Sequence, residues 1–73
     1  MLEHLRGLRE DNELTQTDLA RLLNVSQSTY SDYEHEKLNI PINSLKKLAL
    51  YFHTSVDYII DFTNERTPYS RTK

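Results

Sequence analysis

The strongest constraint on the fold lies in residues 14–34, where two short helical patterns are separated by only a few residues. The first pattern, about residues 16–23, places three leucines and an alanine on one face. The second, about residues 27–35, turns two tyrosines inward and leaves an amide, several hydroxyls and an acid outside. Such a short connection predicts two helices that meet at a steep angle, which is a helix–turn–helix.

Capping residues support these two helices. Thr15 is a good N-cap, and Asp18 follows three residues later, as in a capping box. Asn24 is expected to stop the helix in the left-handed conformation, and Ser26 to cap the next one. The sequence therefore predicts both ends of the turn.

Three further helices are predicted around this pair. The first spans about residues 2–11 and ends at Asn12, which tolerates the left-handed conformation. Pro41 pre-sets the start of the fourth helix, and Thr54 caps the fifth. The inward side chains of these last two helices are expected to be Leu45, Leu48, Ala49, Phe52, Val56, Ile59 and Ile60. We predict an all-α domain over residues 1–62 and a polar, flexible tail over residues 63–73.

Composition excludes several classes of protein. The chain of 73 residues is long enough for one small domain, and it has no cysteine for a disulfide or a thiolate metal site. No apolar run approaches a membrane span, so we expect a cytoplasmic protein. The three histidines, His4, His35 and His53, are too scattered to bind one metal, and we expect them on the surface. No arrangement of acids, hydroxyls or glycines indicates catalysis or a cofactor.

The charge balance does not point to nucleic acid. Residues 1–61 carry six Lys and Arg against ten Asp and Glu, a balance of −4. Nucleic-acid-binding domains usually present a basic face. The alternative of a protein-interaction module therefore stays open.

Four stretches together carry a family resemblance: LRGLR, LTQTDLARLLNVSQSTYSDYE, NIP and LKKLALYFHTSVDYII. In this order and spacing, from residue 2 to residue 61, they resemble the Cro/cI-like repressor helix-turn-helix family, also called the XRE family. The resemblance implies a compact five-helix, lambda-repressor-like DNA-binding domain with its helix-turn-helix at helices two and three. Glu13, Asn24 and Glu36 stand where the family often has glycine. We expect Asn24 to substitute well, and Asn12 to end the first helix in place of Glu13.

The resemblance also implies a function and its residues. The protein would be a sequence-specific, double-stranded DNA-binding transcriptional regulator, repressor-like and encoded by a bacterium or phage. Its third helix would read the major groove, where Gln pairs with adenine and Asp accepts from cytosine. The expected base contacts are Gln27, Ser28, Thr29, Ser31 and Asp32. Phosphate contacts, which position the protein without reading sequence, are expected from Gln16, Arg21, Lys37 and Asn39.

Several of these residues have a structural alternative. The polar face of the third helix could be merely solvated, and Tyr30 and Tyr33 are expected in the core rather than stacked on bases. By resemblance, Arg9 and Glu34 form an internal ion pair. A homodimer is expected through the fifth helix and the segment after it, where Tyr58, Ile59 and Phe62 would leave apolar surface exposed; alternatively, all three are buried within one subunit.

Overall fold

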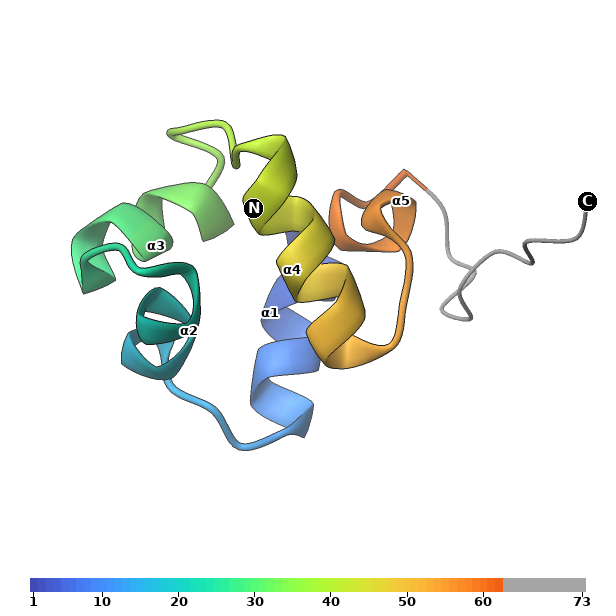
Figure 1. The fold of residues 1–73 in the computed structure, drawn as a ribbon, viewed down its shortest axis with the longest axis horizontal. Coiled ribbons are helices and arrows are strands. Elements are labelled where there is room, and N and C mark those ends of the chain that lie inside the picture. Colours follow the sequence, from blue (N-terminus) through green and yellow to red (C-terminus); the bar gives the residue numbers. More distant parts are fainter. Residues whose placement is uncertain (63–73) are drawn as a thin grey trace, which may run out of the picture.

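The computed structural model describes residues 1–62, and the elements of this part are all α-helices (Figure 1). The predicted flexible tail, residues 63–73, lies outside the described residues. The helices are α1 (Glu3–Asp11), α2 (Gln16–Leu23), α3 (Gln27–Glu34), α4 (Ile42–Phe52) and α5 (Val56–Ile59). The predicted fold class, an all-α domain of five helices, is confirmed.

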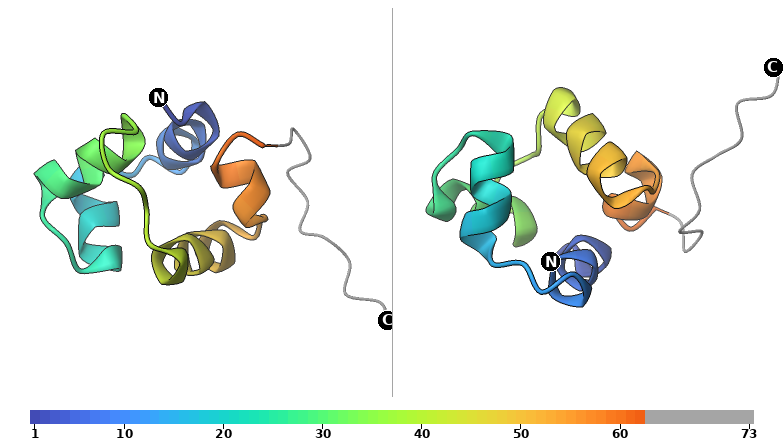
Figure 2. Two further views of the ribbon diagram at one scale, coloured as in Figure 1. Left: turned by 90° about the horizontal axis from the view of Figure 1, so that it is seen from above. Right: turned by 60° about the horizontal axis from the view of Figure 1, so that its bottom comes forward.

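The helices form two pairs joined by α1. α2 packs against α3 at one end of the molecule and α4 packs against α5 at the other, while α1 contacts both α3 and α5 (Figures 1 and 2). The α2–α3 pair is thus joined to the rest of the fold through α1. Its outer side faces away from α4 and α5.

One core holds the two pairs together. Leucines of α1 meet Tyr30 of α3, Leu48 of α4 and Ile59 of α5, and all of these side chains are almost completely buried. Burial of a side chain of this size contributes about 1.5–3 kcal/mol. The buried apolar residues are Leu2, Leu5, Leu8, Leu19, Ala20, Leu23, Tyr30, Tyr33, Leu48 and Ile59. The expected inward position of both tyrosines is confirmed.

The helix–turn–helix has the predicted caps. The Thr15 side chain accepts from the Asp18 backbone N–H at 3.1 Å, and the Asp18 carboxylate accepts from the Thr15 N–H at 2.8 Å. At the turn, Asn24 is left-handed with φ 60°, and the Ser26 hydroxyl accepts from the Thr29 N–H at 3.1 Å. Local sequence therefore fixes where α2 ends and α3 begins.

All five described helices end in the same way, and no glycine is involved. In each, a residue with positive φ is followed by one whose N–H bonds to the carbonyl five residues back, as in a Schellman motif. The left-handed residues are Glu13, Asn24, Glu36, His53 and Asp61. A non-glycine residue costs about 1–2 kcal/mol in this conformation. The one glycine of the chain, Gly7, lies inside α1 instead.

Two details of the predicted helix ends are wrong. α1 ends at Asp11 with Asn12 as its C-cap, as predicted, but Asn12 has φ −95° and it is Glu13 that turns left-handed, with φ 57°. The reason is that the Leu14 N–H bonds to the Arg9 carbonyl at 3.0 Å, which requires the reversal one residue later than expected. At α5, Ser55 rather than Thr54 is the N-cap, and its hydroxyl accepts from the Tyr58 N–H at 3.1 Å.

A cap from a distant part of the chain begins α1. Leu2 is the N-cap residue of this helix, and its apolar side chain cannot accept a hydrogen bond. The Asp61 carboxylate accepts instead from the N–H groups of Glu3 and His4, both at 3.0 Å. His4 stacks on the Tyr58 ring, and its Nδ1 lies 2.7 Å from the Tyr58 carbonyl oxygen. The expectation of a surface histidine is therefore wrong for His4, while His35 and His53 are exposed.

The apolar residues around α5 divide between core and surface. Ile59 is completely buried and Tyr58 is partly buried, but Phe62 is 79% exposed. Ile60, expected to face inward, is 41% exposed. Tyr58, Ile59 and Phe62 are therefore neither all exposed nor all buried, the two alternatives that the sequence left open. The reason is that α5 is only one turn long and the chain reverses at Asp61.

Glu13→Gly is expected to raise the free energy of unfolding by about 1 kcal/mol, because it removes the left-handed strain of a residue with a Cβ. Glu13→Ala is the control. It removes the same carboxylate but keeps the Cβ, so its free energy of unfolding should stay near that of the wild type. Urea unfolding followed by circular dichroism measures both. Equal stabilisation by the two variants would show that charge, not conformation, limits this position.

Candidate nucleic-acid interface

The expected reading helix lies on the outside of the molecule. α3 occupies the edge farthest from α5, with one side against α2 (Figure 1). Gln27 and Ser28, in its first turn, are exposed, whereas Thr29, Ser31 and Asp32 are half-buried. The first turn of α3 is therefore the most accessible part of the predicted base-contacting set.

The hydroxyls of this turn are partly used within the helix. The Ser26 hydroxyl bonds to the Thr29 hydroxyl at 2.9 Å and lies 3.3 Å from that of Ser28. Further along, the Ser31 hydroxyl lies 3.4 Å from Nδ1 of His35. Thr29 and Ser31 thus have intramolecular partners, and Ser28 is the most exposed hydroxyl of the predicted set.

Two glutamines join the starts of α2 and α3. Nε2 of Gln27 donates to Oε1 of Gln16 at 2.5 Å, and Nε2 of Gln16 donates to Oε1 of Glu34 at 3.4 Å. An expected base-contacting residue and an expected phosphate-contacting residue are therefore brought into direct contact. The side chains of Arg21, Lys37 and Asn39 form no such bond to α3, although the Lys37 backbone N–H bonds to the Asp32 carbonyl at 2.8 Å.

Glu34 is the buried end of this chain of hydrogen bonds. Its side chain is only 1% exposed, and Nε and Nη2 of Arg9 donate to its two oxygens at 2.9 and 3.2 Å. The Tyr30 hydroxyl donates to Oε2 at 2.8 Å. The ion pair between Arg9 and Glu34 is thus present, and it is bidentate, the strongest form of this interaction.

These donors keep Glu34 ionised. Burial works against the charged form, but hydrogen bonds from Arg9 and Tyr30 and the positive charge of Arg9 more than offset it, so the pKa of Glu34 is lowered. Burial, followed by the neighbouring carboxylate, raises the pKa of the Tyr30 phenol, which therefore stays protonated as a donor. The site is a charged, fully bonded cluster inside the domain.

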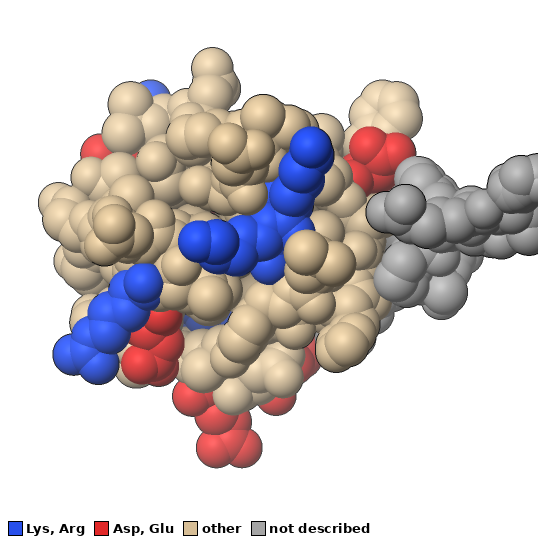
Figure 3. Space-filling view, in the orientation of Figure 1, with Lys and Arg blue, Asp and Glu red and all other residues tan. Residues whose placement is uncertain are grey.

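The basic side chains available for phosphate are few. Arg9 and Arg6 are paired with Glu34 and Glu10. On the face shown in Figure 3, basic groups lie over α2 and α4, the helices that carry Arg21, Lys46 and Lys47. Arg21 and Lys37 are exposed, as a phosphate contact requires.

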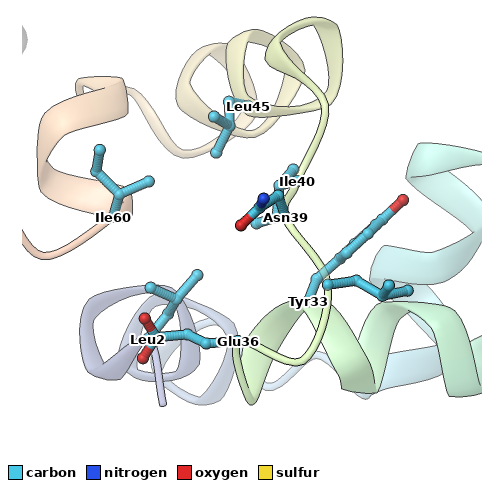
Figure 4. A pocket seen from close by; sticks show the side chains of 8 residues that line it. Leu2, Tyr33, Glu36, Asn39, Ile40, Leu45 and Ile60 are labelled. Atoms are coloured by element: carbon cyan, nitrogen blue, oxygen red, sulfur yellow. The ribbon is translucent and has the colours of Figure 1, made fainter.

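Asn39, another expected phosphate contact, lies in the loop after α3, two residues beyond Lys37. It borders a hollow between α1, α4, α5 and the loop after α3 (Figure 4). Apolar side chains form much of the lining: Leu2, Leu38, Ile40, Leu45 and Ile60. The side chain is exposed, and the structure shows no bond that would direct it to α3.

Acidic side chains lie at the start of α2 and around the end of α3. Asp18 belongs to the capping box of α2, and the hydrogen bond from the Thr15 backbone lowers its pKa. Its carboxylate thus uses part of the anion-attracting N-terminus of α2. Asp32 is half-buried on α3, and Glu36 is exposed just after it. These charges oppose phosphate binding and limit non-specific affinity.

The arrangement of helices and the comparisons agree. The model of a helix-turn-helix family matches residues 5–59, which is most of the chain. The chain belongs to the Cro/cI-like, or XRE, helix-turn-helix family. Members of this family are DNA-binding regulators of transcription and are not typically enzymes.

One curated relative matches as well. The chain is 36% identical over 66 residues to a protein named "Uncharacterized HTH-type transcriptional regulator YobD" from Bacillus subtilis (strain 168). The match covers 90% of this chain and 59% of that protein, so the chain spans about three fifths of the relative's length. No solved structure matches the chain significantly.

Within residues 1–62, no three acidic or histidine side chains gather where they could hold a metal ion. None of the five described helices has the length and hydrophobicity of a membrane span.

Glu34→Gln is expected to lower the free energy of unfolding by about 3 kcal/mol at neutral pH, because it leaves Arg9 without its buried partner. A lowered folded-state pKa means that Glu34 stabilises the domain above its ordinary value of 4.5 and loses this contribution as the pH falls through the folded-state pKa. The difference in the free energy of unfolding between wild type and variant should therefore shrink as the pH falls below 4.5.

Urea unfolding at several pH values measures this difference. Glu10→Gln is the control, because its exposed pair with Arg6 should contribute little at any pH. A Glu34→Gln difference that stays constant from neutral to acidic pH would contradict the role of the carboxylate charge.

Proposed function

We propose that this domain is a sequence-specific, double-stranded DNA-binding transcriptional regulator of the repressor type, which acts in the cytoplasm and reads the major groove with α3. The observation that carries the proposal is the placement of Gln27, exposed in the first turn of α3 and held there by Gln16. In helix–turn–helix proteins the N-terminal residues of the second helix approach the base edges, and the first helix crosses the backbone.

The Gln27 amide retains the groups that adenine requires. Nε2 carries two hydrogens, and one of them is donated to Gln16. The other hydrogen and Oε1 can then bond to N7 and N6 of an adenine, the bidentate contact that distinguishes this base. Ser28 and Asp32 are proposed as neighbouring base contacts. The Asp32 carboxylate would accept from the N4 amino group of a cytosine. Thr29 and Ser31 are weaker candidates because of their intramolecular bonds.

Electrostatics predicts modest affinity for a single domain. If Arg21 and Lys37 are the two cationic phosphate contacts, the slope of log affinity against log salt is about −2 for one domain. Gln16 would add a neutral contact, and Asn39 another. Two domains on one duplex would double the slope and multiply the affinity, which supports a dimer bound to symmetric half-sites.

The dimer contact is proposed at the end of the described chain. Phe62 is 79% exposed and Ile60 is 41% exposed. Ile60 also lines the hollow that Asn39 borders. Exposed apolar groups that lie together commonly mark an interface with another protein. This part of the surface lies at the end opposite α3, so it leaves the reading helix free.

One observation favours a second candidate, a protein-interaction module on the same fold. Residues 1–61 carry a charge balance of −4, and acids lie at the start of α2 (Asp18), late in α3 (Asp32) and just after α3 (Glu36). A protein partner with a basic face would match this surface. The two candidates differ in whether the domain binds duplex DNA at all.

Selection from a pool of random duplexes, sequenced after several rounds, is expected to yield a preferred site with two symmetric halves. On that site, Gln27→Ala should reduce discrimination at one base pair per half-site by a factor of about 5–150, the range for one bidentate contact. Lys37→Gln is the contrast: it should weaken binding to all sequences alike and make the salt slope shallower by about 0.9 per domain. Absence of binding by the wild type at micromolar concentration would favour the interaction module.

Phe62→Glu is expected to convert a dimer into a monomer, because it places a charge in the proposed apolar contact. Sedimentation equilibrium of the wild type and the variant over a range of concentrations measures this. Leu50→Glu is the matched control, since Leu50 is also 79% exposed but belongs to α4 and not to the proposed contact. A wild type that sediments as a monomer at all concentrations would end the proposal.

A further inference from the structure

We propose that the buried Tyr30 hydroxyl is a positioning group for DNA reading, because it helps to set which end of the Gln27 amide faces the duplex. The inference rests on the proposed function and deepens it: Tyr30 does not touch DNA but acts through Glu34 and Gln16. Four hydrogen bonds carry the proposal, and they run from the core to the surface of α3.

The first step is the saturation of Glu34. An ionised carboxylate has two oxygens and only accepts hydrogen bonds. Oε2 receives the Tyr30 hydroxyl at 2.8 Å and Nε of Arg9 at 2.9 Å. Oε1 receives Nη2 of Arg9 at 3.2 Å and Nε2 of Gln16 at 3.4 Å. Tyr30 and Arg9 together therefore hold the carboxylate so that Oε1 is presented to Gln16.

The second step is the orientation of two amides in series. Because Glu34 can only accept, Gln16 must turn its NH₂ group inward and its oxygen outward. The outward oxygen accepts from Gln27, so Gln27 must in turn direct its NH₂ group toward Gln16. Oε1 of Gln27 and the second hydrogen of its Nε2 then remain available to bond to a base in the major groove. A buried anion thereby selects one of the two orientations that each amide could adopt.

The third step is the rigidity of Tyr30. Its side chain has no exposed surface and belongs to the core that joins α1, α3, α4 and α5. Its hydroxyl is therefore a fixed point, while Gln16 is half-buried and Gln27 is exposed. Loss of the hydroxyl would leave Oε2 with Arg9 alone and free the carboxylate to rotate. The bond from Gln16 at 3.4 Å, the longest of the four to Glu34, would be the first to lengthen.

Tyr30→Phe tests the proposal, because it removes one oxygen and keeps the ring. On the duplex chosen by selection, we expect the variant to lose about tenfold of the discrimination at the base pair read by Gln27, within the range of one bidentate contact. Affinity for non-specific duplex should change less than discrimination, because Gln16 is the only proposed phosphate contact that the variant disturbs, and this contact is neutral. In a double-mutant cycle, Gln27→Ala should have less effect on discrimination in the Tyr30→Phe background than in the wild type.

A second readout does not require DNA. In proton–nitrogen spectra of the free domain, the side-chain NH₂ signals of Gln16 and Gln27 should both shift in Tyr30→Phe. Tyr33→Phe is the matched control, since it removes a hydroxyl from the same helix outside the Glu34 bonds. If Tyr30→Phe is unfolded, the same variant is made together with Gly7→Ala, which improves helix propensity and meets no atom within 4 Å.

The outcomes separate this inference from the proposed function. A wild type that selects no preferred duplex overturns the proposed function, whatever Tyr30→Phe does. A wild type with a clear preference that Tyr30→Phe retains in full overturns the role of Tyr30. Unchanged Gln27 signals in the folded variant also overturn it, with or without DNA. Reduced discrimination together with shifted amide signals supports it.

Discussion

The structure depends on a carboxylate that has been removed from water. An ionised Glu34 at 1% exposure would be strongly destabilising if it were unpaired, since desolvation of an ion costs several kcal/mol even after relaxation. Here Arg9 comes from α1, Gln16 from α2 and Tyr30 from α3. Three helices must therefore be in place at once for the charge to be satisfied. The cluster ties the helix–turn–helix to α1 at a defined angle, which apolar contacts alone would specify less sharply.

Helix positions followed from the sequence because they depend on local patterns. The spacing of leucines predicted α1 and α2, and the side chains of Thr15 and Ser26 predicted where α2 and α3 begin. Helix ends were harder, because five non-glycine residues adopt the left-handed conformation and side-chain type alone does not reveal this. At the first of these ends, the choice between Asn12 and Glu13 depends on which N–H reaches the Arg9 carbonyl, a property of the folded chain.

For the candidate site, the sequence proposed a set of residues but not their arrangement. The family resemblance singled out Gln16 and Gln27, but not that the two amides bond to each other and that Gln16 bonds to Glu34. Such bonds join residues 11 and 18 positions apart, and no periodic pattern encodes them. The one available signal was the presence of an amide in the first turn of both helices. A count of charges was also an incomplete guide to phosphate binding. Arg6 and Arg9, two of the six cations in residues 1–61, are paired with carboxylates of the domain.

The contact between Asp61 and the start of α1 affects where this domain can be cut. The family's pattern stops at residue 59, yet the carboxylate that receives the first N–H groups of α1 comes two residues later. A fragment that ends at residue 59 would contain the residues of all five described helices, but it would lack the carboxylate that caps α1. The start of α1 would then fray, and His4 would lose its contact with Asp61. Anyone who transplants this module into a fusion protein should carry the chain through Asp61.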